Sequence, residues 1–357
     1  MTNQTIRVLV VDDSAVVRQI MQSILSLDPS LSVETAADPI FALRKISAGA
    51  PDVLITDLEM PRMDGVDFIR TVMRDSPLPV IVCSGLAERG TSLALRVLDL
   101  GVAEIITKPK LGIKEFLNDS GVMLLDAVHS AVLSRKRSGA PVVPPSPSVL
   151  PPRRLALHQT VPAAEPLIVL GASTGGVEAL TCILQAMPVD SPPILVVQHM
   201  PEHFTRAFAE RLNSQCALEV YEAVEGQRLR SGLALIAPGN LHLTVSHTKS
   251  GYQAHLHSGP LISRHRPSVD ELFCSAARVA GANAIAAILT GMGDDGARGL
   301  LEMRQADAQT IAQDQASCVV FGMPAEAIRC NAAQQVLPLS KIAPAICTLL
   351  RKRFGIA

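Results

Sequence analysis

The sequence predicts an α/β protein of two doubly wound parallel-sheet domains joined by a proline-rich linker. Short apolar runs alternate with amphipathic stretches in both halves of the chain, which is typical of repeated strand–helix units. Between the halves, prolines crowd residues 135–165, and no acidic residue occurs between Asp126 and Glu165. We therefore expect a first domain over residues 1–134, an extended linker over 135–165 and a second, larger domain over 166–357.

Five strand–helix units are expected in the first domain. Apolar runs predict strands at Arg7–Asp12, Leu31–Thr35, Val53–Asp57, Val80–Ser84 and Glu104–Thr107. Apolar residues at helical spacing predict helices at Ser14–Leu27, Pro39–Ala48, Gly65–Arg74 and Leu93–Leu100. This alternation implies a (βα)5 domain with a parallel sheet, since right-handed crossovers connect parallel strands.

The second domain repeats this pattern and adds a hairpin. Apolar runs predict strands at Leu167–Gly171, Ile194–Gln198, Leu233–Ala237 and Ala284–Thr290. From Leu241 to Leu256, apolar and polar residues alternate in HLTVSH and YQAHLH, which is typical of two antiparallel strands. We therefore expect a mainly parallel sheet with an antiparallel hairpin.

Composition excludes several classes of protein. The 357 residues carry 32 Lys+Arg against 33 Asp+Glu, so a general nucleic-acid binder is not expected. Aromatic residues make up 3% and Trp is absent, which argues against base-stacking surfaces. No apolar run approaches the roughly 18 residues of a membrane span. The start lacks a signal-peptide pattern, and seven scattered Cys favour reduced thiols, so we expect a cytoplasmic protein.

A group of acidic residues is expected at one edge of the first sheet. Asp12 and Asp13 end the first predicted strand and Asp57 ends the third, whereas Ser84 and Lys108 end the fourth and fifth. Carboxyl ends of parallel strands share one edge, where ligands bind. Carboxylates gathered there repel one another unless a cation such as Mg²⁺ and a lysine lie between them. The same arrangement suits phosphoryl transfer to a carboxylate.

These residues resemble those of the receiver domain of two-component response regulators. The matching motifs are VVDDS, ITDLEMPRMDG, CSG and TKP, over roughly residues 5–130. The resemblance implies that Asp57 accepts the phosphoryl group and that Asp12 and Asp13, with Asp57, hold Mg²⁺. It also implies that Ser84 and Lys108 contact the phosphoryl group.

The second domain opens with a glycine-rich turn that allows three interpretations. A buried strand leads into GASTGG, residues 171–176, and then into a helix. The turn is compatible with a phosphate cradle at a helix N-terminus, with a nucleophile turn of the G-x-S-x-G type around Ser173, or with a plain glycine-rich connection.

Two later strand ends favour the nucleophile. His199 ends the strand ILVVQ, and Asp294 and Asp295 follow the strand AIAAILT. A serine hydroxyl needs a base to take its proton, and the base needs an acid to fix its tautomer. The residues alone do not separate Asp294 from Asp295, and one of the two is expected to cap the helix that starts at ARGLLEMR. Glycines around Met292 could expose backbone N–H groups for an oxyanion.

At these residues the second domain resembles the catalytic domain of the chemotaxis protein-glutamate methylesterase, which is also a protein-glutamine glutaminase. The matching motifs are GASTGG, VVQHMP, IAPG, HRPSVD, TGMGDDGARG and CVVFGMP. The resemblance implies a nucleophile Ser173, a general base His199 and an orienting acid Asp295, with Thr174 and Met292 lining the site and no cofactor for hydrolysis. It assigns no chemical role to HRPSVD beyond shaping the substrate groove.

The resemblance also implies partners and regulation. Methyl-accepting chemotaxis receptors would be the substrate, and a chemotaxis histidine kinase would be the phosphodonor. The unphosphorylated receiver would cover the mouth of the active site until phosphorylation of Asp57 loosens it.

Two other functions fit parts of the sequence. His255 and His257 share one strand face, with His242, His247 and His265 nearby, which is a conceivable zinc site. Alternatively, the second domain only binds a partner, and GASTGG holds a phosphate or nucleotide. Metal analysis and labelling with a serine-directed reagent would discriminate these alternatives from a hydrolase.

Overall fold

The computed structural model describes residues 5–84, 90–108, 120–137, 166–202, 204–249 and 251–355. The chain divides into two compact units, residues 1–137 and 138–357, and each is described by itself. Among the described residues, no helix has the length and apolar character needed to cross a membrane.

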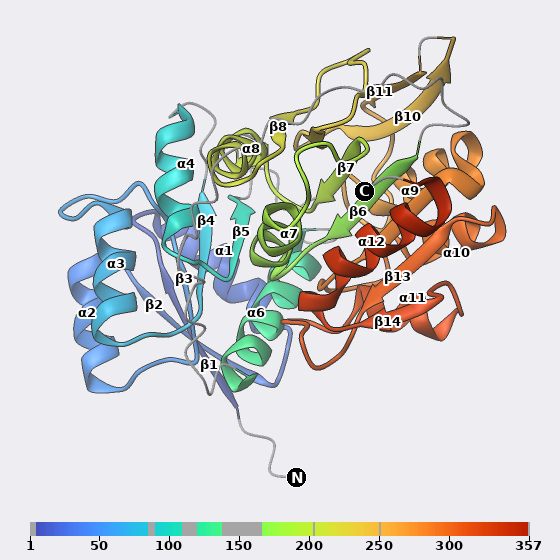
Figure 1. Cartoon of the computed structure of the whole chain (residues 1–357). Helices are drawn as coiled ribbons and strands as arrows, with labels where there is room; N and C mark the ends of the chain where they lie inside the picture. Colours follow the sequence, from blue (N-terminus) through green and yellow to red (C-terminus); the bar gives the residue numbers. More distant parts are fainter. Residues whose placement is uncertain are drawn as a thin grey trace. The chain divides into compact units, whose positions relative to one another are not determined.

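The first unit is a parallel sheet with helices on both faces (Figure 1). Within the described residues its strands lie in the order β2-β1-β3-β4-β5. The strands are β1 (Ile6–Val11), β2 (Leu31–Ala36), β3 (Val53–Thr56), β4 (Val80–Ser84) and β5 (Glu104–Thr107). The helices are α1 (Ala15–Leu25), α2 (Pro39–Ala48), α3 (Gly65–Asp75), α4 (Gly90–Asp99) and α6 (Ser120–Arg137). The (βα)5 sheet predicted from the sequence is therefore present, and α1 and α6 share a core with β1 and β3.

Helix α6 extends beyond residue 134, where we expected the first domain to end. It continues to Arg137, three residues into the segment that we assigned to the linker. Residues 135–137 are Arg-Lys-Arg, which are good helix formers, and the first proline comes only at Pro141. The rest of the predicted linker, residues 138–165, lies outside the described residues.

The second unit contains a larger parallel sheet. Its described strands follow the order β14-β13-β12-β6-β7-β9-β8. They are β6 (Leu167–Ala172), β7 (Ile194–Gln198), β8 (Glu219–Glu222), β9 (Leu233–Ile236), β12 (Ala284–Ile288), β13 (Gln309–Gln313) and β14 (Gln335–Leu337). The chain winds outward from β6 in one direction and then returns to build β12, β13 and β14 on the other side. The order therefore reverses between β6 and β12, which is where α/β sheets bind ligands.

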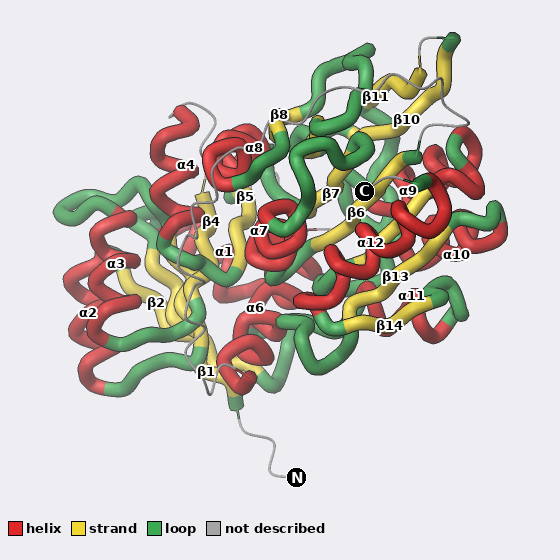
Figure 2. The backbone as a smooth tube through the Cα atoms, in the orientation of Figure 1, coloured by secondary structure: helices red, strands yellow, loops and turns green. Residues whose placement is uncertain are grey.

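Two helical layers cover this sheet (Figure 2). One layer packs α7 (Gly176–Gln185) between α8 (Phe204–Gln215) and α12 (Leu339–Phe354), and the other packs α10 (Ala297–Gln305) between α9 (Val269–Val279) and α11 (Met323–Arg329). A short 3₁₀ helix, η1 (Gly281–Asn283), leads into β12. The predicted hairpin is formed by β10 (His242–Thr248) and β11 (Gly251–His257), and it packs on α9.

Several sequence expectations for this unit need correction. Strands β8, β13 and β14 were not predicted, and β12 ends at Ile288 instead of Thr290. β8 and β14 are short edge strands of four and three residues, and β13 starts and ends with glutamine, so none has a long apolar run. Thr290 leaves the ladder because its backbone N–H donates to the buried Gln313 side chain (2.9 Å).

Candidate functional site

The structure brings the predicted acidic residues of the first unit together. Asp12 follows β1 and Asp57 follows β3, and these two strands are neighbours. Asp12, Asp13 and Asp57 each offer a carboxylate oxygen within 4.8 Å of the others. Asp12 and Asp57 are buried, whereas Asp13 is exposed. Three carboxylate oxygens at this spacing fit a hard cation such as Mg²⁺.

Lys108 lies against two of these carboxylates. Its Nζ is 2.6 Å from Asp57 Oδ2 and 2.8 Å from Asp12 Oδ2. Burial raises the pKa of Asp57, and the hydrogen bond and charge of Lys108 oppose this rise without cancelling it. One ammonium group therefore compensates this set of carboxylates only in part.

Ser84 is the remaining predicted residue of this edge. Its backbone pairs with Thr107 at the carboxyl end of β4. Its side chain lies outside the described residues.

In the second unit, two neighbouring strands hold the backbone of Ser173 at the start of a tight turn. Its N–H donates to Thr290 O (3.0 Å), while its carbonyl accepts from Gln198 Nε2 (2.9 Å) and from Gly176 N (2.7 Å). Gly175 has a φ of 77°, a conformation that favours glycine, and begins helix α7 as its N-cap. Of the three interpretations, a serine whose backbone is held this firmly at the switch point of the sheet favours a nucleophile turn.

His199 and Asp295 form a buried pair beside this turn. His199 follows β7 and Asp295 lies in the loop after β12, and the His199 Nε2 is 2.8 Å from Asp295 Oδ2. An ionised carboxylate only accepts, so Nε2 carries the proton and Nδ1 keeps the lone pair. The buried Nδ1 has no hydrogen-bond partner within the described part of the chain. The imidazole therefore has one free basic nitrogen.

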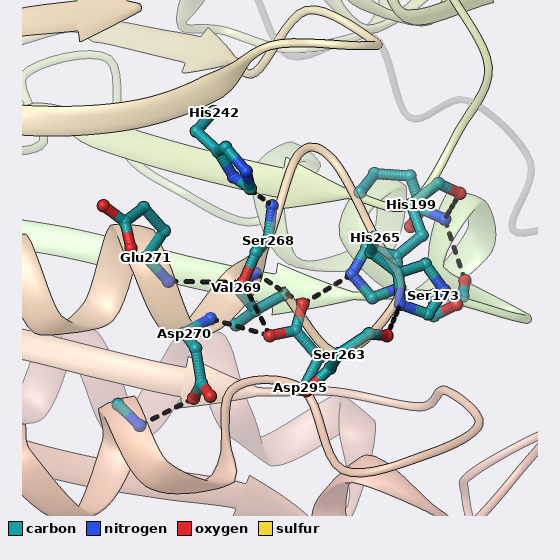
Figure 3. A network of polar contacts seen from close by, with 12 residues as sticks. Ser173, His199, His242, Ser263, His265, Ser268, Val269, Asp270, Glu271 and Asp295 are labelled. Atoms are coloured by element: carbon teal, nitrogen blue, oxygen red, sulfur yellow. Dashed lines mark hydrogen bonds and ion pairs between the residues drawn. The ribbon is translucent and has the colours of Figure 1, made fainter. Parts of the chain in front are cut away.

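Ser173 lies next to this histidine by strand register. Ala172 and Gln198 are partners in the β6–β7 ladder, and His199 N donates to Ala172 O (3.1 Å), so the following residues lie side by side. Figure 3 places Ser173 next to the histidine rings. No hydrogen bond from the Ser173 hydroxyl to the ring is recorded among the described residues. Catalytic hydrogen bonds are often incomplete before substrate binds.

The structure separates the two neighbouring aspartates. Asp295 is buried and accepts from Ser268 Oγ (2.7 Å), Val269 N (2.7 Å) and Asp270 N (3.0 Å), whereas Asp294 is exposed. Ser268 is the N-cap of α9, so Asp295 lies at the positive end of that helix. Burial opposes ionisation, but the hydrogen bond from His199 and these backbone donors hold the pKa of Asp295 below its usual value.

The prediction that Asp294 or Asp295 is the N-cap of helix α10 is wrong. Its N-cap is Gly296, with a φ of 89°, which has no side chain to cap the helix. The backbone oxygen of Asp294 accepts from Ala297 N (3.1 Å), and the carboxylate of Asp270, from α9, accepts from Gly299 N (2.7 Å) in the first turn. The carboxylate of Asp295 turns toward α9 instead, because three donors converge there.

Thr174 and Met292 flank the turn. The Thr174 carbonyl accepts from Thr290 Oγ1 (2.9 Å), which ties the two loops together. Met292 lies in the loop after β12 and is partly exposed. Next to it, Gly291 passes so close that a Cβ there would lie 2.7 Å from Ser173 Cβ. The turn that carries Thr174 and the loop that carries Met292 are therefore held in close contact.

His265 joins this site, whereas the sequence placed it only in the HRPSVD motif and near a conceivable zinc site. Its ring stacks on His199 with centroids 3.7 Å apart and an interplanar angle of 6°. Its Nδ1 donates to Ser263 O (2.6 Å). Burial and the proximity of His199 lower the pKa of His265 to about 3, although the charge of Asp295 opposes this. Neither the HRPSVD motif nor the group of histidines predicted that its ring lies on that of His199.

The histidines suggested as a zinc site have other partners. His255 Nδ1 lies 2.8 Å from Glu225 Oε1 and its Nε2 lies 2.8 Å from Ser246 Oγ, while His242 Nε2 lies 2.8 Å from Pro260 O. His199, His265 and Asp295 also offer ligand atoms within 4.8 Å. However, stacked parallel rings direct their in-plane lone pairs along parallel planes, so these do not converge on one ion.

Comparisons with known proteins match both units. A family model described as CheB methylesterase matches residues 168–346, and one described as response regulator receiver domain matches residues 8–117. A protein-glutamate methylesterase/protein-glutamine glutaminase of Oleidesulfovibrio alaskensis is 50% identical, covering 96% of this chain and 97% of that protein. A protein of the same description from Geobacter metallireducens is 49% identical, covering 96% of this chain and 99% of that one.

A solved structure resembles the second unit. The crystal structure of the Thermotoga maritima CheB methylesterase catalytic domain matches with a TM-score of 0.51 and 39% identity, covering 52% of this chain and all of that domain. The relatives are 49% and 50% identical over nearly the whole chain, and family models match both units. These matches show that this chain belongs to the CheB methylesterase family.

Proposed function

We propose that this chain is a protein-glutamate methylesterase and protein-glutamine glutaminase that acts on methyl-accepting chemotaxis receptors. The observation that carries the proposal is the buried His199–Asp295 pair, because the histidine lies beside Ser173 at neighbouring strand ends and its Nδ1 has no hydrogen-bond partner among the described residues. The names of the relatives support the substrate class.

The hydrolysis follows from the roles of these three groups. The Ser173 oxygen attacks the carbonyl carbon of a glutamyl methyl ester while His199 Nδ1 takes the hydroxyl proton. That proton then passes to the leaving group, which departs as methanol, and the acyl group stays on Ser173. Water attacks the acyl-enzyme with His199 again as base, and glutamate is released. A glutamine side chain takes the same path, with ammonia as the leaving group.

Asp295 keeps its charge through both steps. It fixes the proton on Nε2 and stabilises the imidazolium that forms when Nδ1 is protonated. Its donors from the start of α9 are already in place, so the carboxylate does not need to reorganise during the reaction.

The first unit is proposed to control this activity through Asp57. Asp57 accepts the phosphoryl group from a chemotaxis histidine kinase, and Lys108 and Ser84 contact it. Asp12, Asp13 and Asp57 hold Mg²⁺, which would neutralise charge on the transferring group. The carboxylate spacing and the partial compensation by Lys108 support this assignment. Phosphorylation raises hydrolase activity by favouring the active arrangement of the chain.

Replacing the nucleophile tests the hydrolase directly. Ser173→Ala should abolish methanol release from methylated receptors and labelling by a serine-directed reagent, while phosphorylation of the chain by acetyl phosphate continues. The matched control is Ser191→Ala, a buried serine before the start of β7, at the other edge of the sheet. Full activity in Ser173→Ala would refute the hydrolase. Neither labelling nor methyl release in the wild type would favour an output domain that only binds a partner.

A further inference from the structure

We propose that His265 is a positioning residue for the general base, because its flat ring holds the imidazole of His199 in the plane that serves both Asp295 and Ser173. The inference rests on the proposed roles of these three residues. The stack of two rings 3.7 Å apart and 6° from parallel carries it.

The stack limits the one motion that the Asp295 bond leaves open. A single hydrogen bond at Nε2 (2.8 Å) fixes one corner of the His199 ring but allows the ring to tilt about that contact. The face of His265 blocks this tilt on one side, and it does so without a hydrogen bond to His199. The lone pair on His199 Nδ1 therefore keeps its direction.

The backbone around His265 is built to hold that ring. Ile262 and His265 exchange two backbone hydrogen bonds, of 3.1 and 2.8 Å, which close a tight turn. Ser263 and Arg264 between them have φ values of 45° and 67°, as a type I′ turn requires, and non-glycine residues rarely adopt these values. The Arg266 guanidinium anchors the turn to Asn240 Oδ1 (2.7 Å) and Gly259 O (2.7 Å). Strained backbone that is held this firmly often marks a functional site.

The protonation of His265 suits this role. A carbonyl only accepts, so the bond to Ser263 O places the proton on Nδ1. The charged and titratable groups that act on this ring are His199, Asp295 and Arg264, and burial together with His199 keeps the ring neutral. When His199 takes the serine proton, the cation faces a neutral aromatic surface and not a second cation.

Two substitutions at His265 in the full chain test whether a flat ring against His199 is what matters, or a nitrogen of His265. His265→Phe keeps a flat ring without a titratable nitrogen, and His265→Met fills the same space with a flexible chain that adapts to irregular cores. The kcat and KM for methanol release from methylated receptors are measured over a range of pH. We expect Phe to retain kcat within about threefold and Met to lose roughly 10- to 100-fold in kcat with little change in KM.

Three results would overturn the proposal. Retention of kcat by the Met variant would show that no flat ring is needed beside His199. A loss in the Phe variant as large as in Met would show that a His265 nitrogen takes part in the chemistry. Disappearance of the acid limb of the pH profile in the Phe variant would mean that His265 itself is the titrating base.

A spectroscopic readout is independent of hydrolysis. The proton that His199 Nε2 shares with Asp295 is expected to give a downfield proton resonance that persists in the Phe variant and broadens in the Met variant. This difference would stand even if Ser173→Ala retained activity, so failure of the positioning role and failure of the hydrolase are distinguishable. An unchanged resonance in the Met variant would contradict the positioning role.

Discussion

At the scale of single residues, the site depends on where a carboxylate points. Asp294 and Asp295 are adjacent and chemically identical, yet one is exposed and the other accepts from His199 and from three groups at the start of α9. Because the pKa of Asp295 is held low in the folded chain, the charged form is stabilised there. This is the form that fixes the tautomer of His199.

Asp295→Asn should lower kcat for methanol release by roughly 10³- to 10⁴-fold, because an amide in place of the acceptor allows the wrong imidazole tautomer. Asp294→Asn is the matched control, with the same change one residue away on the surface, and should stay close to wild type. Steady-state kinetics on methylated receptors make the comparison. Equal losses in the two variants would be incompatible with our assignment of the acid.

At the scale of elements, the site is a meeting of loops that approach unusually closely. Ser173 follows β6, and Gly291 follows β12, the neighbouring strand across the switch point. A Cβ at Gly291 would lie 2.3 Å from Met323 Sδ and 2.7 Å from Ser173 Cβ. Because Gly291 has no side chain, Ser173 can lie this close to the loop after β12.

Gly291→Ala should reduce kcat far more than it reduces stability, because the new methyl group must displace Ser173 or the loop that carries Met323. A displacement of about 1 Å in a catalytic group can cost about 100-fold. Gly226→Ala serves as the control: its φ of 71° strains an alanine, but nothing lies within 4 Å. Kinetics and thermal unfolding of both variants separate the effects, and an active Gly291→Ala would argue against the close approach.

A second contact between elements links the start of β2 to helix α6. Asp28 Oδ2 lies 2.7 Å from His129 Nε2, and its Oδ1 accepts from Ser30. The Ser30 hydroxyl and the His129 bond lower the pKa of Asp28 from 3.8 to about 2. The charged form is thus favoured by folding, and its stabilising effect is present above pH 4 and lost as the pH falls toward 2.

Asp28→Asn should therefore lower the free energy of unfolding at neutral pH, and the difference from wild type should shrink between pH 4 and pH 2. Urea unfolding of the two proteins across this range measures it. Asp75→Asn offers a comparison, since Asp75 forms an ion pair with its exposed neighbour Arg74 and the substitution should have a small effect. A pH-independent difference for Asp28→Asn would contradict the assigned ionisation.

At the scale of the whole molecule, two compact units each carry a group of polar residues at the carboxyl edge of a parallel sheet. In both, the site lies at the switch point, between β1 and β3 in the first unit and between β6 and β12 in the second. The carboxyl edge of a parallel sheet serves phosphoryl acceptance in one unit and hydrolysis in the other, because the residues that follow the strands differ.

Asp57→Ala should keep basal methanol release but lose the stimulation that acetyl phosphate and Mg²⁺ produce in the wild type. The acceptor carboxylate is then missing, while the second unit is unchanged. Asp67→Ala removes a carboxylate that is exposed on α3 and should respond like wild type. Stimulation of Asp57→Ala to the wild-type level would rule out Asp57 as the regulatory acceptor.

The alternation of apolar runs predicted most of both folds. Strands β1 to β7, β9 and β12 and the two strands of the hairpin lie close to the predicted positions. Strands β8, β13 and β14 were not predicted. The strands that escaped prediction have short or polar-ended sequences whose pairing depends on a neighbour already in place. The catalytic assignments of Ser173, His199 and Asp295 remain predictions, although the structure places the three close together.

The sequence by itself determined the strand–helix order and the polar residues at strand ends, because hydrophobic periodicity and chain connectivity are local properties. It placed both aspartates at the end of one strand but could not choose between them from residues alone, and it did not predict that His265 lies beside His199. Only the tertiary structure decided these points, since the direction of a carboxylate and the stacking of two rings depend on contacts between segments about 65 to 95 residues apart.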